Sequence, residues 1–252
     1  EIDMPLMVAN GVLGVRETVS DCPEWTWLRR RAGLDCLAQI RAWQQAIEAG
    51  DLLGPRILAT GSWIVDDPDY VSLDAPDYFH MDSPERGRRL AEHYAEVGVD
   101  FVKIYSGVSP TGYSALVEHA RELGLDVAGH APLTISAIEA SEAGQQSFEH
   151  ARVFLFNCLD GAAEFRAQAQ GLSANGNTDG RRRMADGYDP QLCQPVFDSF
   201  RRNGTANVPT HVTRRFDAMV EDSAYRNDPR ARYIPADQWE AWNDDAHGTI
   251  AA

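Results

Sequence analysis

The sequence predicts an α/β fold in which parallel strands curve into a barrel. Short apolar segments rich in β-branched residues alternate with segments of helical periodicity, which is typical of parallel strands joined by crossover helices. Three polar residues stand where successive strands should end: Lys103 in VDFVKIY, His130 in LDVAGHA and His150 in QQSFEHA. Each interval has room for one helix and one strand, so these residues should meet at one mouth of the barrel, where such barrels carry out chemistry.

The N-terminal third predicts two strands separated by a helix. Residues 9–19 (ANGVLGVRETV) and 55–65 (PRILATGSWIV) are apolar and β-branched, as strands are. Residues 33–49 carry apolar side chains at near-helical spacing, and Gly50 can end that helix. The Asp- and Pro-rich residues 66–82 predict a loop.

A helix over 84–97 should follow this loop. Ser-Pro-Glu at 83–85 supplies an N-cap, a first-turn proline and an acid that matches the helix dipole, and Gly98 supplies the C-terminal cap. Residues 99–105 (VDFVKIY) then predict a strand that is apolar on both faces, as in a sheet covered by helices.

The same pattern repeats twice. Ser-Pro at 109–110 begins a helix that should end at Gly124, and residues 125–131 predict the next strand. A short helix over 134–143 then precedes a strand over 145–151.

The C-terminal part of the chain has weaker signals. We expect helices over 162–170 and 190–203 and a strand over 205–212. Residues 173–188 show no periodicity and predict a loop. The remainder should be mostly helical, with loops.

The length and composition are those of one large α/β domain. The chain has 252 residues, 44% of them hydrophobic, and a mean hydropathy of -0.37, as in an ordinary soluble globular protein. Acidic residues outnumber basic residues by 38 to 23, for a formal net charge of -15. Because so acidic a surface repels phosphate, we expect neither nucleic-acid binding nor docking on an anionic membrane.

No segment predicts a membrane span or a signal peptide. No apolar run approaches the roughly 20 residues that a bilayer requires, and EIDMPLMVANGV at the N-terminus lacks a basic region and a long apolar region. The localisation therefore stays open between cytoplasm and periplasm. The four cysteines (Cys22, Cys36, Cys158 and Cys193) form no CxxC pair, so we interpret them as small buried hydrophobic residues and not as a zinc knuckle.

Lys103 is a polar residue in an apolar strand, a position that is costly unless the amine is satisfied. One interpretation is an amine that reaches solvent or pairs with a carboxylate. The other is a buried amine whose lowered pKa makes the neutral form reactive. Such an amine can form a Schiff base, or react with carbon dioxide to give a carbamate that ligates metal.

His130 and His150 also admit two interpretations. A lone histidine at a strand end is often a satisfied core residue. Two neutral imidazoles on neighbouring strands at one barrel mouth instead make half of a site for a divalent metal. Glu149 should point to the opposite face of the strand from His150, so it is not an automatic partner for that ring.

The stretch from VDFVKIY to QQSFEHA resembles the centre of imidazolonepropionase-like metal-dependent amidohydrolases. NGVLGVRET resembles the second barrel strand of this family and GPRILATG the third, so the resemblance covers most of residues 8–220. It implies a (β/α)8 TIM-type barrel, of which about six strand–helix units are recognisable here. It also implies one or two divalent metals, usually zinc, that activate water to hydrolyse an amide or peptide-like bond.

By the family pattern, Lys103 is a carboxylated lysine that bridges two metals, and His130 and His150 are ligands of the second metal. Relatives of this type often cleave dipeptides, acyl amino acids or cyclic amides, so the expected partner is a small amide or peptide. Candidate substrate contacts are Tyr105, two residues beyond Lys103; His211, near the end of the strand over 205–212; and Arg16 and Arg214, either of which could receive a carboxylate. For Arg214 the alternative is a solvated helix start.

The sequence departs from the family at several places. It has no His-x-His pair, which the first strand of the family uses for the first metal, and no recognisable eighth strand with its general-base aspartate. The flanking β-sandwich is also missing, and Glu17 stands where relatives often have an aspartate. We therefore interpret residues 1–252 as a single barrel domain without the first and eighth strands.

These departures leave other functions open. The main alternative is a catalytically silent fragment or binding module, without metal, that keeps the barrel scaffold. A Schiff-base lyase that uses Lys103 is a further alternative, but it gives His130 and His150 no coordinated role. Because an open parallel sheet exposes two edges, a second copy of the chain is a candidate cover for them.

Overall fold

Six short strands form the centre of the computed structural model, which describes residues 3–63, 71–169 and 178–251. In chain order they are β1 (Gly14–Glu17), β2 (Arg56–Thr60), β3 (Phe101–Ile104), β4 (Asp126–Gly129), β5 (Ser147–Glu149) and β6 (Ala206–Val208). The described strands pair in parallel: β1 with β2, and β3 to β6 each with the next. A single parallel bridge between Gly61 and Phe101 joins the two sheets.

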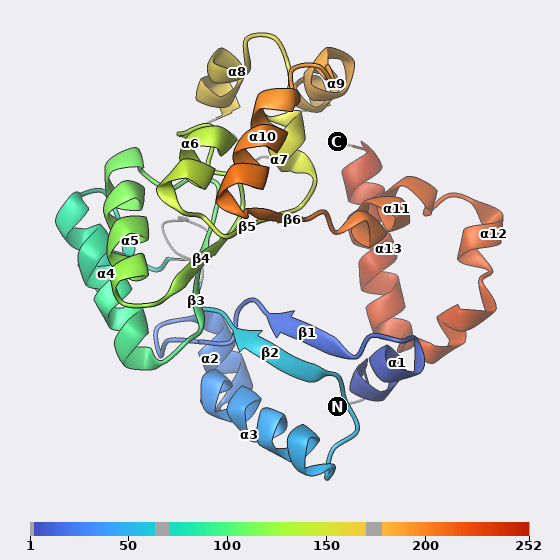
Figure 1. The fold of residues 1–252 in the computed structure, drawn as a ribbon. Coiled ribbons are helices and arrows are strands. Elements are labelled where there is room, and N and C mark those ends of the chain that lie inside the picture. Colours follow the sequence, from blue (N-terminus) through green and yellow to red (C-terminus); the bar gives the residue numbers. More distant parts are fainter. Residues whose placement is uncertain (1–2, 64–70, 170–177, 252) are drawn as a thin grey trace.

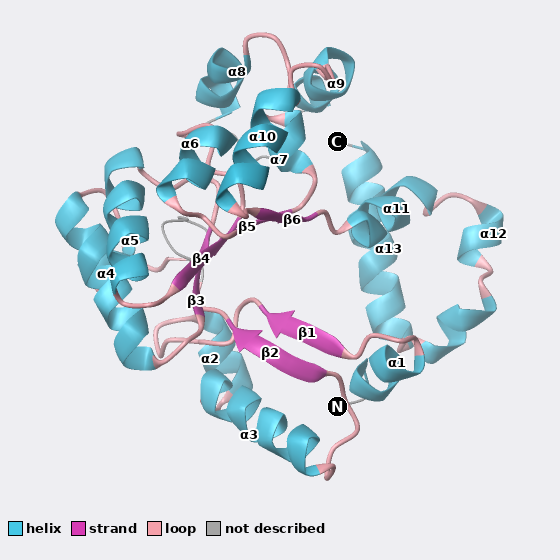
Figure 2. Ribbon diagram, in the orientation of Figure 1, coloured by secondary structure: helices cyan, strands magenta, loops and turns pink. Residues whose placement is uncertain are grey.

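The strands therefore form an arc in chain order (Figures 1 and 2). The predicted parallel α/β architecture is confirmed. A closed barrel is not, because in the described residues β1 and β6 do not pair with each other. The C-terminal helices and the N-terminal helix lie between the two ends of the arc in Figure 1.

Helices cover the outer side of the arc, with α3, α4, α5, α6 and α10 arranged around it in Figure 2. The α-helices are α1 (Asp3–Ala9), α2 (Trp27–Ala32), α3 (Cys36–Ala49), α4 (Pro84–Val97), α5 (Pro110–Glu122), α6 (Ala137–Ala143), α7 (Arg152–Leu155), α8 (Ala162–Ala169), α9 (Thr178–Gly187), α10 (Gln194–Asn203), α11 (His211–Met219), α12 (Ser223–Arg226) and α13 (Ala236–Ala251). Two short 3₁₀ helices, η1 (Asp77–Phe79) and η2 (Pro229–Tyr233), complete the set.

Both predicted caps of α4 and the predicted N-cap of α5 are confirmed, whereas α5 ends at Glu122 with Leu123 as its C-cap and not at Gly124. The Ser83 hydroxyl accepts a hydrogen bond from the Arg86 amide, and Gly98 closes α4 in a left-handed conformation with φ of 83°. The Ser109 hydroxyl accepts in the same way from the Gly112 amide. These caps satisfy backbone donors that the first helical turn leaves unpaired.

Several predicted boundaries were wrong. Residues 178–187, expected in a loop, form α9, while residues 173–177 of that expected loop lie outside the described residues. The strand over 205–212 shortens to β6, because the chain turns into α11 at His211. The two N-terminal strands are also shorter than predicted, and residues 64–65 of the second lie outside the description.

The main core lies between β3 and the helix pair α4 and α5. Leu90 and Tyr94 of α4, Leu116 of α5, and Val102 and Ile104 of β3 are all fully buried. Burial of each such side chain contributes roughly 1.5–3 kcal/mol relative to exposure. This core fixes the strand that carries Lys103.

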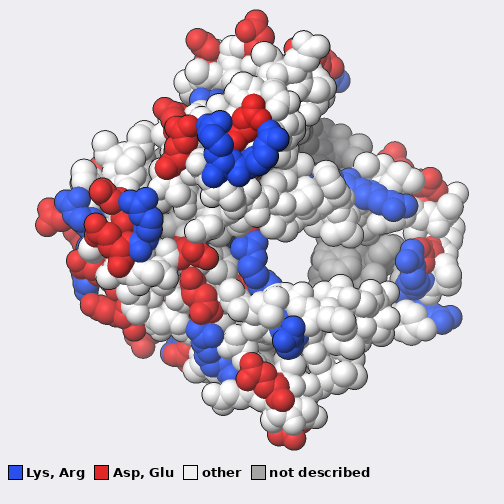
Figure 3. Space-filling model, in the orientation of Figure 1, with Lys and Arg blue, Asp and Glu red and all other residues white. Residues whose placement is uncertain are grey.

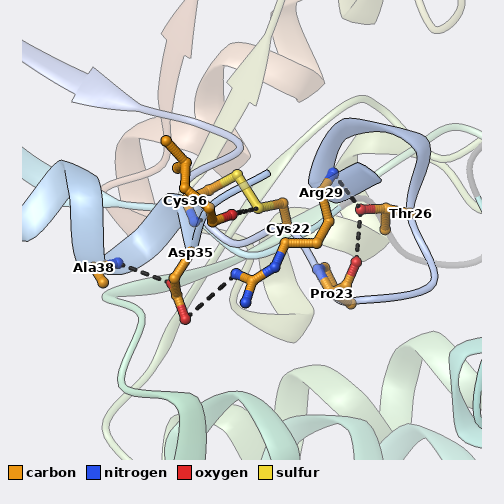
Figure 4. Close-up of a disulfide and its surroundings, with 8 residues drawn as sticks. Cys22, Pro23, Thr26, Arg29, Asp35, Cys36 and Ala38 are labelled. Carbon is orange, nitrogen blue, oxygen red and sulfur yellow. Dashed lines mark hydrogen bonds and ion pairs between the residues drawn. A yellow bond between two sulfur atoms is a disulfide. The ribbon is translucent and has the colours of Figure 1, made fainter. Parts of the chain in front are cut away.

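All four cysteines form disulfides, which corrects their interpretation as simple buried residues. Cys22 pairs with Cys36 and Cys158 with Cys193, with Cα–Cα separations of 5.6 and 4.8 Å. Figure 4 shows the first bridge at the start of α3, where Asp35 caps the helix by accepting from the Ala38 amide. The wide sequence spacing carried no pairing signal, because it is the fold that brings the partners together.

None of the described helices is long and apolar enough to cross a membrane. On the face shown in Figure 3, acidic and basic side chains are interspersed over α4 and α5. The same view shows the molecule hollowed inside the arc, with Lys or Arg atoms at the edge of the hollow.

Candidate active site

Lys103 lies in β3 with only 6% of its surface exposed. Its backbone amide donates to the Ser62 hydroxyl at 2.7 Å, which links β3 to the segment after β2. In the described part of the chain, the Lys103 amine has no hydrogen-bond partner. Burial lowers the pKa of Lys103, while Glu149 opposes this shift and Arg16 adds to it. The Lys103 side chain is therefore buried, as the second interpretation requires, whereas its reactivity stays a prediction.

His130 and His150 point their Nε2 atoms at each other across 3.1 Å. Their rings meet nearly edge to face, with centroids 4.8 Å apart. The other nitrogen of each ring is held by a hydroxyl: Nδ1 of His130 lies 3.2 Å from Ser106 Oγ, and Nδ1 of His150 lies 2.6 Å from Thr210 Oγ1. The residues that follow β3, β4, β5 and β6 thus meet at one pair of imidazoles. The sequence predicted that strand-end residues would meet in this way.

Unusual backbone conformations bring the two rings together. Gly129 has φ of 137°, and a Cβ there would collide with the Ile104 carbonyl, so glycine permits the close approach of β4 to β3. His150 has φ of 69°, in the left-handed region that residues with a Cβ rarely adopt. This conformation ends the alternation of β5 and turns the ring of His150 toward His130.

Both imidazoles are neutral at neutral pH. Burial and the charge of Lys103 lower the pKa of His130 to about 2. Burial, followed by the charges of Arg152 and Lys103, lowers the pKa of His150 to about 4. Neutral imidazole is the form that ligates metals.

Tyr105 lies against His130 in a stacked arrangement, with ring centroids 3.8 Å apart and planes inclined by 27°. It is half-buried, so the ring covers one face of the imidazole and leaves an edge open. The predicted placement of Tyr105 at this mouth is confirmed, whereas its contact with substrate stays a prediction.

Arg16 and Glu149 form an ion pair that the sequence interpretation missed. Arg16 donates to Glu149 Oε1 at 2.7 Å and to Ser147 Oγ at 3.2 Å, so β1 is connected to β5. Glu149 is 6% exposed and its charge acts on Lys103. Alternation along β5 could not identify Arg16 as the partner of Glu149, because Arg16 lies in β1.

His211 and Arg214 lie on α11, and the charge of Arg214 is among those that lower the pKa of His150. His211 begins α11 and is exposed, so its predicted position in a strand was wrong. Arg214 is exposed and pairs with Asp217 at 2.9 Å on the same helix, consistent with the alternative of a solvated helix start. Their roles in substrate binding remain predictions.

The donor set fits part of a metal site. Two imidazole nitrogens on one tetrahedral zinc ion stand about 3.3 Å apart, from zinc–nitrogen distances near 2.0–2.1 Å, and the observed separation is 3.1 Å. Within the described residues, no group of three or more His, Cys, Asp or Glu side chains could hold a metal. A third protein ligand from the described residues must therefore be something other than His, Cys, Asp or Glu, and Lys103 is the neighbouring candidate.

Comparison with solved structures supports the fold. The chain is similar to bottromycin amidohydrolase, with 19% identity and a TM-score of 0.57 over 98% of this chain and 47% of that one. More distant similarity is found to a Xaa-Pro dipeptidase with bound methionine, with 16% identity and a TM-score of 0.47 over 97% of this chain and 53% of that one. A. niger ochratoxinase is similar at 14% identity, with a TM-score of 0.42 over 86% of this chain and 57% of that one.

The likeness to bottromycin amidohydrolase confirms, at the level of the fold, the resemblance to amidohydrolases stated from the sequence. The chain spans about half the length of the first solved structures that it matches. No protein-family model and no curated protein matches it.

Proposed function

We propose that this chain is the central part of a metal-dependent hydrolase that cleaves amide or peptide-like C–N bonds in dipeptides, acyl amino acids or cyclic amides. The observation that carries the proposal is the pair of neutral imidazoles, 3.1 Å apart, beside a buried lysine. The amidohydrolase fold supports the reaction class, since bottromycin amidohydrolase is named for this activity.

His130 and His150 would hold the metal, zinc in the first instance, through Nε2. Ser106 and Thr210 fix the orientation of the two rings through Nδ1, as outer partners of metal-bound histidines usually do. A divalent cation, when bound, supplies Lewis acidity toward the substrate carbonyl. Lys103 would join the ligand set as a carbamate: its amine forms an N–C bond to carbon dioxide and loses a proton.

The remaining residues of the site position the substrate. Tyr105 covers one face of His130 and limits the access of water to that ring. Arg16 is held by Glu149 and Ser147, so a substrate carboxylate would compete with Glu149 for the guanidinium. Arg214 would have to leave Asp217 for the same purpose.

The disulfides support an oxidising location. Disulfides persist in secreted and periplasmic proteins and are rare in the cytosol. Of the two compartments that the sequence left open, the periplasm is therefore the one we propose, on the basis of both cysteine pairs.

A catalytically silent binding module is the second candidate. It is favoured by the absence of a His-x-His pair from the sequence and of a three-membered His, Cys, Asp or Glu group from the described residues. The two candidates differ in whether the purified chain holds zinc and turns over amides.

Metal analysis of the zinc-saturated, dialysed chain tests the proposal. We expect near-stoichiometric zinc that is lost in His130→Ala and His150→Ala but retained in His119→Ala, whose ring pairs with Glu122 on the helix surface. Dipeptides and acyl amino acids should be hydrolysed by the zinc form. A wild-type chain that binds no zinc refutes the proposal and favours the binding module, whereas stoichiometric zinc without hydrolysis refutes the hydrolase activity alone.

The carbamate has its own test. Lys103→Ala should lose hydrolysis and regain part of it on addition of short carboxylic acids, which can replace the carbamate as an oxygen ligand. Full activity of Lys103→Ala without additive would refute this role for Lys103.

A further inference from the structure

The C-terminal helices line an open cavity that shares no residue with the imidazole pair. It has a volume of about 610 Å³ and lies between α11, α13 and the segment from α12 through η2. This size is within the range of sites for small organic ligands. Its lining is predominantly apolar, and none of its residues is a metal ligand or substrate contact of the reaction proposed above.

Four aromatic side chains form the apolar wall. Phe216 of α11 is central, with the ring centroids of Tyr225, Trp239 and Trp242 at 5.9, 5.7 and 6.3 Å, all in edge-to-face arrangements. Trp242 remains 45% exposed, although it lines the cavity. A large ring that is partly open to solvent beside an apolar cavity is suited to contact a ligand.

The charged side chains that line the cavity give it a net negative charge. Asp217 is compensated by Arg214 at 2.9 Å, and Asp228 by Arg230 at 2.5 Å. Asp245 also lines the cavity and has no ion pair with any described residue. The carboxylate of Asp245 can therefore act on a ligand in the cavity, next to aromatic rings. Both a carboxylate and the faces of aromatic rings attract cations.

We propose that this cavity binds an organic cation that consists of an aromatic body and one ammonium group. The body packs against Trp239 and Trp242, and the ammonium lies at Asp245. Asp245 repels an anionic ligand, and a neutral ligand lacks the electrostatic attraction to this carboxylate. The inference stands independently of the proposed hydrolase activity.

Calorimetric titration with three probes of similar shape tests the charge preference. Phenethylamine, protonated at pH 7, should bind roughly 2- to 5-fold more tightly than neutral 2-phenylethanol, a ratio expected for a contact with one exposed carboxylate. Phenylacetate should bind more weakly than the alcohol. Equal affinity for the three probes, or no binding of phenethylamine, overturns the proposal.

Variants locate the binding. Asp245→Asn should reduce the affinity for phenethylamine to that for 2-phenylethanol, whereas Asp244→Asn, at the exposed neighbouring position on α13 outside the lining, should not. Trp242→Ala should weaken both probes, with Trp27→Ala, exposed on α2, as the matched control. Unchanged phenethylamine binding in both Asp245→Asn and Trp242→Ala refutes the site. A circular dichroism spectrum equal to that of wild type verifies the fold of each variant.

Discussion

His150 and Thr210 share an unfavourable backbone conformation. With φ of 69° and 50°, they are the two non-glycine residues at positive φ in the described part of the chain, and their side chains hydrogen-bond to each other at 2.6 Å. Each such conformation costs on the order of 1–3 kcal/mol and persists where the surroundings impose it, most often at functional sites. The strain is therefore located at the ring that faces His130.

Thr210→Val tests what this bond contributes. Valine keeps the β-branched shape but removes the hydroxyl, so His150 loses the partner that fixes its orientation. We expect zinc affinity to fall by roughly 10-fold or more, the usual effect of losing an outer partner of a metal-bound histidine, as measured by competition with a chelator. Thr210→Ser, which keeps the hydroxyl, should bind zinc as wild type does. Equal affinities of the valine and serine variants would contradict the assigned role.

The carboxyl group of Asp21 lies in an environment that disfavours its charged form. Its Oδ2 is buried without a hydrogen-bond partner in the described residues. Burial, reinforced by Asp35, raises the pKa of Asp21 from 3.8 to about 6, although the Cys22 amide and Arg29 oppose the shift. The folded state therefore binds this proton more tightly than the unfolded state does, and its stability falls as the pH rises from about 4 to about 6.

Asp21→Asn should accordingly stabilise the protein above pH 6. The expected gain is on the order of 1–3 kcal/mol at pH 8 and diminishes toward pH 4, because one pKa unit corresponds to about 1.4 kcal/mol. Urea unfolding of wild type and variant at several pH values measures it. A gain that does not depend on pH would point to a cause other than the charge.

At the level of elements, α4 and α5 pack with their backbones in close contact. A Cβ on Gly87 would collide with the Gly112 carbonyl, and a Cβ on Gly112 with the Met81 carbonyl. Because the obstacle is backbone and not a flexible side chain, the helices would have to separate to accommodate a methyl group. The two glycines thus set the distance between helices that cover β3.

Gly87→Ala should therefore destabilise the protein by about 1–3 kcal/mol or more, as overpacking does. Gly248→Ala is the matched control, because Gly248 lies in α13 with open space around it and a helical alanine gains roughly 0.5–1 kcal/mol over glycine. Thermal unfolding of both variants should give shifts of opposite sign. Similar stability of the two variants would mean that the close packing is not constraining.

The elements that the sequence predicted well are those with local signals. The Ser-Pro start and the glycine end of α4 are properties of neighbouring residues, and Lys103, His130 and His150 were identified from strand-end position. The ion pair of Arg16 with Glu149 joins residues 133 positions apart, so periodicity within either strand could not reveal it. The helix α9 was missed because its sequence, TDGRRRMADG, is strongly polar and carries few apolar residues from which a helical period can be read.

At the scale of the whole molecule, the two disulfides add constraints to an arc of strands that does not close within the described residues. One joins the loop after β1 to α3, and the other joins the segment after α7 to the start of α10. The edges of β1 and β6 remain the reason to expect a second copy of the chain as a cover, which stays a prediction.

Reduction should therefore lower the thermal midpoint markedly, since one disulfide typically contributes about 2–4 kcal/mol. Unfolding with and without a phosphine reductant measures the change. The variant with all four cysteines replaced by alanine should match reduced wild type and be insensitive to the reductant. An unchanged midpoint for wild type on reduction would show that the bridges contribute nothing to stability.

The order of the strands has a consequence for how the chain is made. Since each strand neighbours the one before it in sequence, every strand–helix unit can dock on its predecessor as it leaves the ribosome, without waiting for distant segments. Arg16 is the exception, because its carboxylate partner emerges only with β5. During synthesis β1 can pair with β2 early, and the late arrival of Glu149 is the step that anchors β1 to the opposite side of the arc.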